Sequence, residues 1–84
     1  MTTEQIIQNK AALTALLRVG RLNEDALRAQ VAVAQNRPLP TVDCKEMIAR
    51  LEGKGWIAGF TDPVLEQVLY VVTPDGRIAL AAMP

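Results

Sequence analysis

A chain of 84 residues, half of them apolar, is long enough for one compact domain with a single core. Nine Lys and Arg residues balance nine Asp and Glu residues, and the sequence contains neither His nor Ser. Catalytic pairs of Ser or Cys with His are therefore excluded, as are metal sites built on His. The single cysteine, Cys44, also excludes a disulfide within the chain and a zinc site with several thiolates. We expect no catalytic site, metal or cofactor.

The first ten residues lack the basic region and the apolar run of a signal peptide. No apolar run approaches the roughly 20 residues that span a bilayer. We therefore expect a cytoplasmic protein that does not contact a membrane. A net charge of zero disfavours strong non-specific binding of nucleic acid, although it leaves room for a local basic face.

The first predicted helix runs from about Thr3 to Val19. Gly20 stands where a left-handed C-terminal cap belongs, and Arg18 lies in the last turn, where a positive charge is favoured. The apolar side chains that follow helical spacing are Ile6, Leu13, Leu16 and Leu17.

A second helix is predicted from Asn23, a good N-cap, to about Gln35. Glu24 and Asp25 place negative charge in its first turn. Leu22 before the cap and Leu27 after it have the spacing of a hydrophobic staple, and the apolar face continues with Leu27, Val31 and Ala34.

Two prolines in the segment 36–40 separate this helix from a third one, which begins near Thr41 or Asp43, and either of these residues can cap it. Asp43 and Glu46 have the spacing of a capping box. Glycines at 53 and 55 end the helix. One apolar face contains Cys44, Met47, Ile48 and Leu51, so a buried Cys44 is favoured over a redox-sensing thiol.

The pattern then changes to that of a β-hairpin. Residues 56–60 and 67–72 are rich in strand formers, and residues 61–66 form the connecting loop. Thr73 and Pro74 are typical of a helix start, so a short last helix containing Ile78 and Leu80 ends near Met83. The prediction is one α+β domain over residues 1–84: three helices, a hairpin and a short C-terminal helix.

Two stretches resemble the winged helix-turn-helix superfamily, and in particular transcriptional regulators of the MarR and PadR types. IARLEGKGWI, residues 48–57, resembles the end of a recognition helix and its turn into the first strand of the wing. YVVTPDGRIAL, residues 70–80, resembles the return strand and the Thr-Pro-x-Gly-Arg start of the following helix. The resemblance spans most of the chain and implies a winged-helix fold.

The resemblance implies a small dimeric transcriptional regulator, of bacterial or phage origin, that binds double-stranded DNA. The recognition helix, residues 41–53, would enter the major groove while the wing contacts the adjacent backbone. Four basic and three acidic residues between positions 37 and 54 leave one positive charge in excess. The candidate DNA contacts are Arg37, Thr41, Lys45, Arg50 and Lys54. A solvated helix face is the alternative for Lys45 and Arg50, with Glu46 and Arg50 forming a surface pair.

The predicted wing differs from that of a DNA-binding protein. From Ala58 to Val72 the sequence has no Lys or Arg, while Asp62 and Glu66 would be repelled by phosphates. Val64 and Leu65 stand at the loop tip, where polar residues are expected; they either fold back on the domain or contact a partner. The second hypothesis is therefore a protein-interaction module that does not bind DNA and uses Val64 and Leu65.

Overall fold

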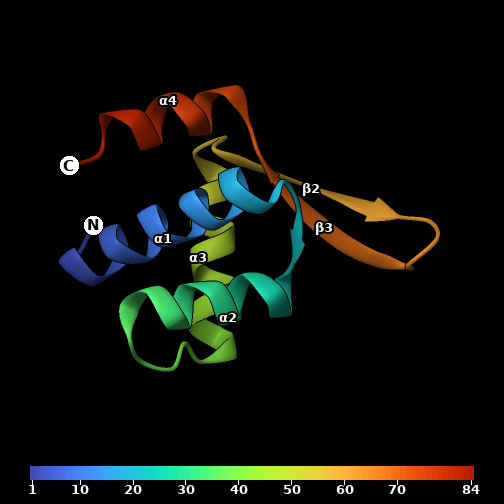
Figure 1. The fold of residues 1–84 in the computed structure, drawn as a ribbon, viewed down its shortest axis with the longest axis horizontal. Coiled ribbons are helices and arrows are strands. Elements are labelled where there is room, and N and C mark those ends of the chain that lie inside the picture. Colours follow the sequence, from blue (N-terminus) through green and yellow to red (C-terminus); the bar gives the residue numbers. More distant parts are fainter.

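The computed structural model describes residues 1–84 and contains four helices and a three-stranded sheet. Figure 1 shows the helices gathered into one body, from which a β-hairpin extends. The predicted α+β winged-helix architecture is confirmed. None of the helices has the length and apolar character needed to cross a membrane. The elements are α1 (Thr3–Val19), β1 (Leu22–Asn23), α2 (Glu24–Gln35), α3 (Thr41–Gly53), β2 (Ile57–Asp62), β3 (Gln67–Val72) and α4 (Pro74–Ala82).

Local chemistry at both ends explains the bounds of α1. The Thr2 hydroxyl accepts a hydrogen bond from the N–H of Gln5 at 3.1 Å, and the Gln5 side chain accepts one from the N–H of Thr2 at 3.0 Å. These two bonds form a capping box. Gly20 ends the helix with a φ of 103°, which only glycine adopts readily. Its ψ of −54° lies outside the left-handed helical region that we predicted for it.

The predicted N-cap of α2, Asn23, is confirmed. The predicted start of α3 at Thr41 is confirmed too, but its predicted cap is wrong. Asn23 Oδ1 accepts a hydrogen bond from the N–H of Ala26 at 2.8 Å. The residue before α3 is Pro40, and no side chain caps that helix, so neither Thr41 nor Asp43 is its N-cap. The φ of Pro40, −58°, already lies near the helical value, which lets the chain enter α3 without a polar cap.

The sheet is antiparallel, with β3 in the centre between β1 and β2. β2 pairs with β3 along its whole length, beginning with Ile57 opposite Val72. It starts one residue later, and ends two residues further along, than the predicted strand 56–60. β1, which pairs Leu22 with Tyr70, was not predicted, because two residues are too few to show a strand period.

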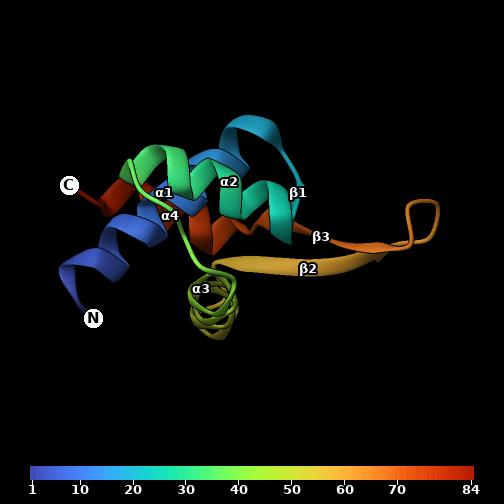
Figure 2. The same cartoon turned by 90° about the horizontal axis from the view of Figure 1, so that it is seen from below.

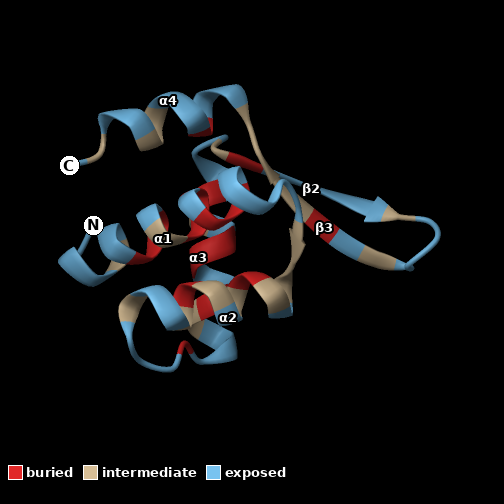
Figure 3. Cartoon of the chain, viewed as in Figure 1, coloured by how far each residue is buried: buried red, intermediate tan, exposed pale blue.

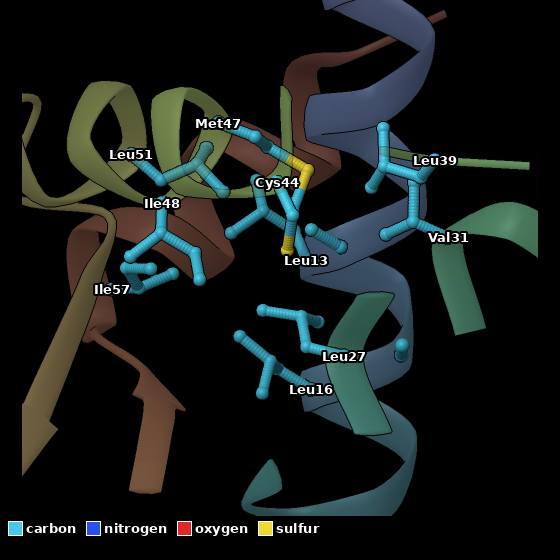
Figure 4. Close-up of a cluster of buried hydrophobic side chains, with 12 residues drawn as sticks. Leu13, Leu16, Leu27, Val31, Leu39, Cys44, Met47, Ile48, Leu51 and Ile57 are labelled. Carbon is cyan, nitrogen blue, oxygen red and sulfur yellow. The ribbon is translucent and has the colours of Figure 1, made fainter. Parts of the chain in front are cut away.

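The core lies where α1, α2 and α3 meet. Figure 3 shows the buried residues concentrated there, while most of the hairpin is exposed. In the close-up of Figure 4 these side chains gather between the three helices, with Ile57 adding to them from the start of β2. The buried cluster consists of Ala12, Leu13, Ala15, Leu16, Leu27, Val31, Leu39, Cys44, Met47, Ile48, Leu51 and Ile57.

Three residues of the predicted apolar faces lie outside this core. Ile6 and Leu17 of α1 are each 44% exposed, and Ala34 of α2 is exposed as well. α1 instead buries two polar residues, Gln8 and Asn9, because their side chains accept hydrogen bonds from α3. The periodicity of apolar residues alone therefore misplaced part of the buried face of α1.

The two stretches that resemble winged-helix regulators meet at the start of α4. The Thr73 hydroxyl donates a hydrogen bond to the carbonyl of Gly55 at 2.6 Å, and its oxygen accepts one from the N–H of Gly76 at 3.0 Å. The N–H of Thr73 also donates to the carbonyl of Trp56 at 3.0 Å. A Cβ atom on Gly76 would collide with that carbonyl. Glycine at position 76 therefore allows α4 to pack against the turn that follows α3.

Candidate nucleic-acid interface

α3 stands apart from the other helices of the body. Figure 2, which shows it end-on, has α3 projecting below the layer that contains the other three helices. Its apolar face is buried as predicted, and its remaining faces are accessible. The residues classed as exposed on this helix are Thr41, Val42, Lys45, Glu46, Ala49, Glu52 and Gly53.

The centre of the outer face of α3 carries a single charge, that of Glu46, and no basic residue. The 3.6-residue period places Val42, Glu46, Ala49 and Gly53 in one stripe opposite the buried side chains. Thr41 and Lys45 lie beside this stripe. The small or apolar residues Val42, Ala49 and Gly53 in this stripe allow close approach to a flat or grooved surface. The stripe was not singled out from the sequence, although the same helical period, applied to the outer side, would have revealed it.

Two of the predicted DNA contacts form exposed ion pairs within the domain. Arg37, in the loop before α3, pairs with Glu4 of α1. Lys45 Nζ lies 3.1 Å from a carboxylate oxygen of Glu24 at the start of α2. Exposed pairs of this kind contribute only about 0–1 kcal/mol, so either cation can exchange its carboxylate for a phosphate at little cost.

Arg50 has a different environment from the other predicted contacts. Its Nε donates a hydrogen bond to Asn9 Oδ1 at 3.0 Å, and its terminal nitrogen donates to Gln8 Oε1 at 3.4 Å. The predicted surface pair between Glu46 and Arg50 is wrong, since no ion pair joins them and the guanidinium turns toward α1. Burial lowers the pKa of Arg50, and the charge of Glu46 partly opposes this effect. Arg50 therefore links α3 to α1.

Lys54 and Trp56 form a contact at the end of α3. The Lys54 ammonium lies 5.1 Å from the centroid of the Trp56 ring, within the range of a cation–π interaction. Lys54 itself is exposed, and Gly55 between them has a φ of 73°. Lys54 thus lies at the end of α3 where β2 begins, on the side from which the hairpin extends.

The hairpin tip is acidic and apolar, as the sequence indicated. The Asp62 carboxylate accepts hydrogen bonds from the N–H groups of Val64 at 2.8 Å and Leu65 at 3.0 Å. Glu66 adopts a left-handed conformation with a φ of 53°. Val64 is 87% exposed and Leu65 58% exposed, so their side chains do not fold back on the domain. The wing offers no positive charge to a phosphate.

Cys44 is a core residue rather than a reactive one. Its side chain is fully buried, and the sulfur lies 4.0 Å from the carbonyl oxygen of Glu24. Burial is the main cause that raises the pKa of the thiol, and the negative charge of Glu24 adds to it. The thiolate that a redox sensor needs is therefore disfavoured, in agreement with the interpretation preferred from the sequence.

The fold is similar to that of known transcriptional regulators. BpsR of Bordetella bronchiseptica, whose DNA binding is regulated by 6-hydroxynicotinic acid, matches 99% of this chain with a TM-score of 0.76 and 25% identity. The chain spans 53% of BpsR, about half its length. A transcriptional regulator from Clostridium thermocellum, Cth-833, matches 96% of this chain and 82% of its own, with a TM-score of 0.79 and 16% identity. No family model and no curated protein sequence matches the chain.

Proposed function

Because this chain is a winged helix-turn-helix domain similar in structure to transcriptional regulators, we propose that it binds double-stranded DNA and regulates transcription. In this proposal α3 is the recognition helix and enters the major groove. Two observations carry the proposal: the projection of α3 from the body, visible in Figure 2, and the exposure of the residues in its outer stripe. Further support is the similarity to BpsR, a regulator that binds DNA.

The uncovered stripe suits contact with base edges better than contact with phosphates. Val42 and Ala49 offer methyl groups of the kind that contact thymine methyls, and Glu46 offers an acceptor for the amino group of cytosine. Thr41 and Lys45 beside the stripe, with Arg37 before the helix and Lys54 after it, would supply the phosphate contacts. Arg50 would act mainly by holding α3 against α1.

This arrangement predicts moderate affinity with a clear dependence on salt. The four basic residues at 37, 45, 50 and 54 are few for a DNA-binding surface, and the wing is acidic. Fluorescence anisotropy with a duplex at about 50 and 200 mM salt separates the outcomes, since phosphate-driven binding weakens steeply over this range. Binding at the lower salt that falls sharply at the higher salt supports the proposal. The absence of binding even at the lower salt contradicts it.

A matched pair of alanine substitutions tests the role of α3. Ala49 and Ala29 are both exposed residues within helices, but only Ala49 lies on the stripe of α3. Ala49→Glu places a negative charge where a groove would be, and should weaken DNA binding by about tenfold or more. Ala29→Glu, which changes the net charge equally, should leave binding close to that of the wild type. Equal effects of both substitutions would exclude α3 as the recognition helix.

The acidic, apolar wing tip favours a second candidate function, a protein-interaction module that does not bind DNA. Val64 and Leu65 are the most accessible large apolar pair in the hairpin, and the nearest charges, Asp62 and Glu66, are negative. This combination suits a protein surface with apolar and basic groups. The anisotropy titration distinguishes the two candidates, because the second predicts no DNA binding at either salt concentration.

A further inference from the structure

An open groove lies between α1 and α2, away from the face of α3. It has a volume of about 430 Å³, and every residue that lines it belongs to α1 or α2. The apolar residues that line it include Ile7 and Ala11 of α1 and Val33 and Ala34 of α2. Ile7 is 49% exposed and Val33 80% exposed. Ile7 and Val33 therefore give the groove an exposed apolar lining that a small apolar segment could cover.

The charges at this groove are all positive. Lys10 and Arg18 of α1 are the only charged residues that line it. The Lys10 ammonium donates a hydrogen bond to a main-chain oxygen of Pro84, the last residue, at 2.6 Å, and Arg18 donates to Gln30 Oε1 at 2.7 Å. Neither cation is paired with the carboxylate of an Asp or Glu side chain, in contrast to Arg37 and Lys45. The groove is therefore suited to an apolar segment with negative charges at its edges.

The wing tip has the complementary properties. Val64 and Leu65 project from it, and the acidic residues Asp62 and Glu66 stand on either side of them. In Figures 1 and 2 the hairpin extends away from the helical body, so its tip does not reach the groove of its own chain. The wing tip of a second copy of the chain is free to reach this groove.

We propose that this chain associates with itself through docking of the wing tip of one copy in the α1–α2 groove of a second copy. Val64 and Leu65 would cover Ile7 and Val33, while the carboxylates at 62 and 66 would meet Lys10 and Arg18. Contact between two grooves would oppose cations, and contact between two wing tips would oppose carboxylates. Only the contact of wing with groove joins opposite charges. This inference depends on the proposed role of the wing as an interaction surface. The docking would leave the outer face of α3 free.

The test reverses the charge of each surface in a separate variant and measures self-association by sedimentation equilibrium. One variant, Asp62→Asn with Glu66→Lys, makes the wing positive, while the amide oxygen introduced at position 62 can still accept the two backbone hydrogen bonds. The other, Lys10→Glu with Arg18→Glu, makes the groove negative. Each variant alone should associate at least about tenfold more weakly than the wild type. An equimolar mixture should regain association, because the positive wing of one variant meets the negative groove of the other.

Several results would overturn the proposal. These are a wild-type chain that remains monomeric at on the order of 100 μM, single variants that associate like the wild type, or a mixture that remains monomeric. An apolar control adds a further check: Val64→Ser with Leu65→Ser should abolish association, whereas Ile78→Ser, at a 70% exposed position of α4 outside both surfaces, should not. The reverse outcome would place the interface on α4. DNA binding, measured separately by anisotropy, is not required for any of these outcomes.

Discussion

Substitution of Gly76 by alanine tests the close approach of α4 to the turn after α3. A Cβ atom at this position would overlap the carbonyl of Trp56 and would lie only 2.8 Å from Cγ2 of Val72. Relief of the overlap requires α4 to move away, which disturbs the hydrogen bond from the N–H of Thr73 to the same carbonyl. Gly53 is a matched control, because it is also helical and a Cβ atom there would meet nothing within 4 Å.

The expected loss of stability follows from three contributions. Overpacking lowers the free energy of unfolding by about 1–3 kcal/mol, and the disturbed hydrogen bond lowers it by about 0.5–1.5 kcal/mol. The better helix propensity of alanine raises it by up to about 1 kcal/mol. Gly76→Ala should therefore lower the free energy of unfolding by about 2 kcal/mol, and the melting temperature by about 8–16 °C. Gly53→Ala should leave stability unchanged or raise it by up to about 1 kcal/mol.

Urea denaturation followed by far-ultraviolet circular dichroism measures both variants. Fluorescence of Trp56, the only tryptophan, reports on the same junction. If the two variants unfold with the same free energy, the contact of position 76 with the Trp56 carbonyl does not limit the packing of α4, and the account of this junction is wrong.

Two further predictions concern groups described above. Arg50→Ala should lower the free energy of unfolding by about 1–3 kcal/mol, because the buried oxygen of the Asn9 side chain loses its hydrogen-bond donor. Lys45→Ala should lower it by at most about 1 kcal/mol, because the ion pair of Lys45 is exposed. Equal denaturation curves for the two variants would contradict this. The raised pKa of Cys44 means that the unfolded chain loses the thiol proton at a lower pH than the folded chain does. The contribution of the neutral thiol to the free energy of unfolding is therefore present below a pH of about 8.5 and is lost as the pH rises through the pKa of the folded chain. The free energies of unfolding of the wild type and Cys44→Ala, measured by urea titration, should therefore converge or cross as the pH is raised from about 8 toward about 10, a range that contains the ordinary thiol pKa. A constant difference between the two free energies over this range would contradict a buried neutral thiol.

The helix bounds were predictable because their determinants are local. Asn23 and Thr73 cap helices whose first turns follow directly in the sequence, and Gly20 supplies a positive φ one residue after Val19. The cap of α3 was less predictable than its start at Thr41, since Pro40 replaces a polar cap there. β1 could not be recognised, because its two residues form a strand only through pairing with β3, far along the chain.

The environments of the candidate DNA contacts could not be predicted, because their partners are distant in the sequence. Arg37 pairs with a residue 33 positions away, Lys45 with one 21 positions away, and Arg50 with one 41 positions away. Patterns at helical spacing reveal neighbours only three or four positions apart. The local pattern therefore suggested a pair between Glu46 and Arg50, whereas packing of α1 against α3 directs Arg50 to Asn9.

The link between Arg50 and α1 has a thermodynamic consequence for the whole domain. The residues that accept from Arg50 and the α1 residues that line the α1–α2 groove lie on the same helix. If α3 binds DNA as proposed, a molecule that shifts α1 on entering the groove would also change the position of α3, and thereby its affinity for DNA. Linkage is reciprocal, so DNA on α3 would change the affinity of the groove by the same factor. One guanidinium would thus couple two surfaces that never touch.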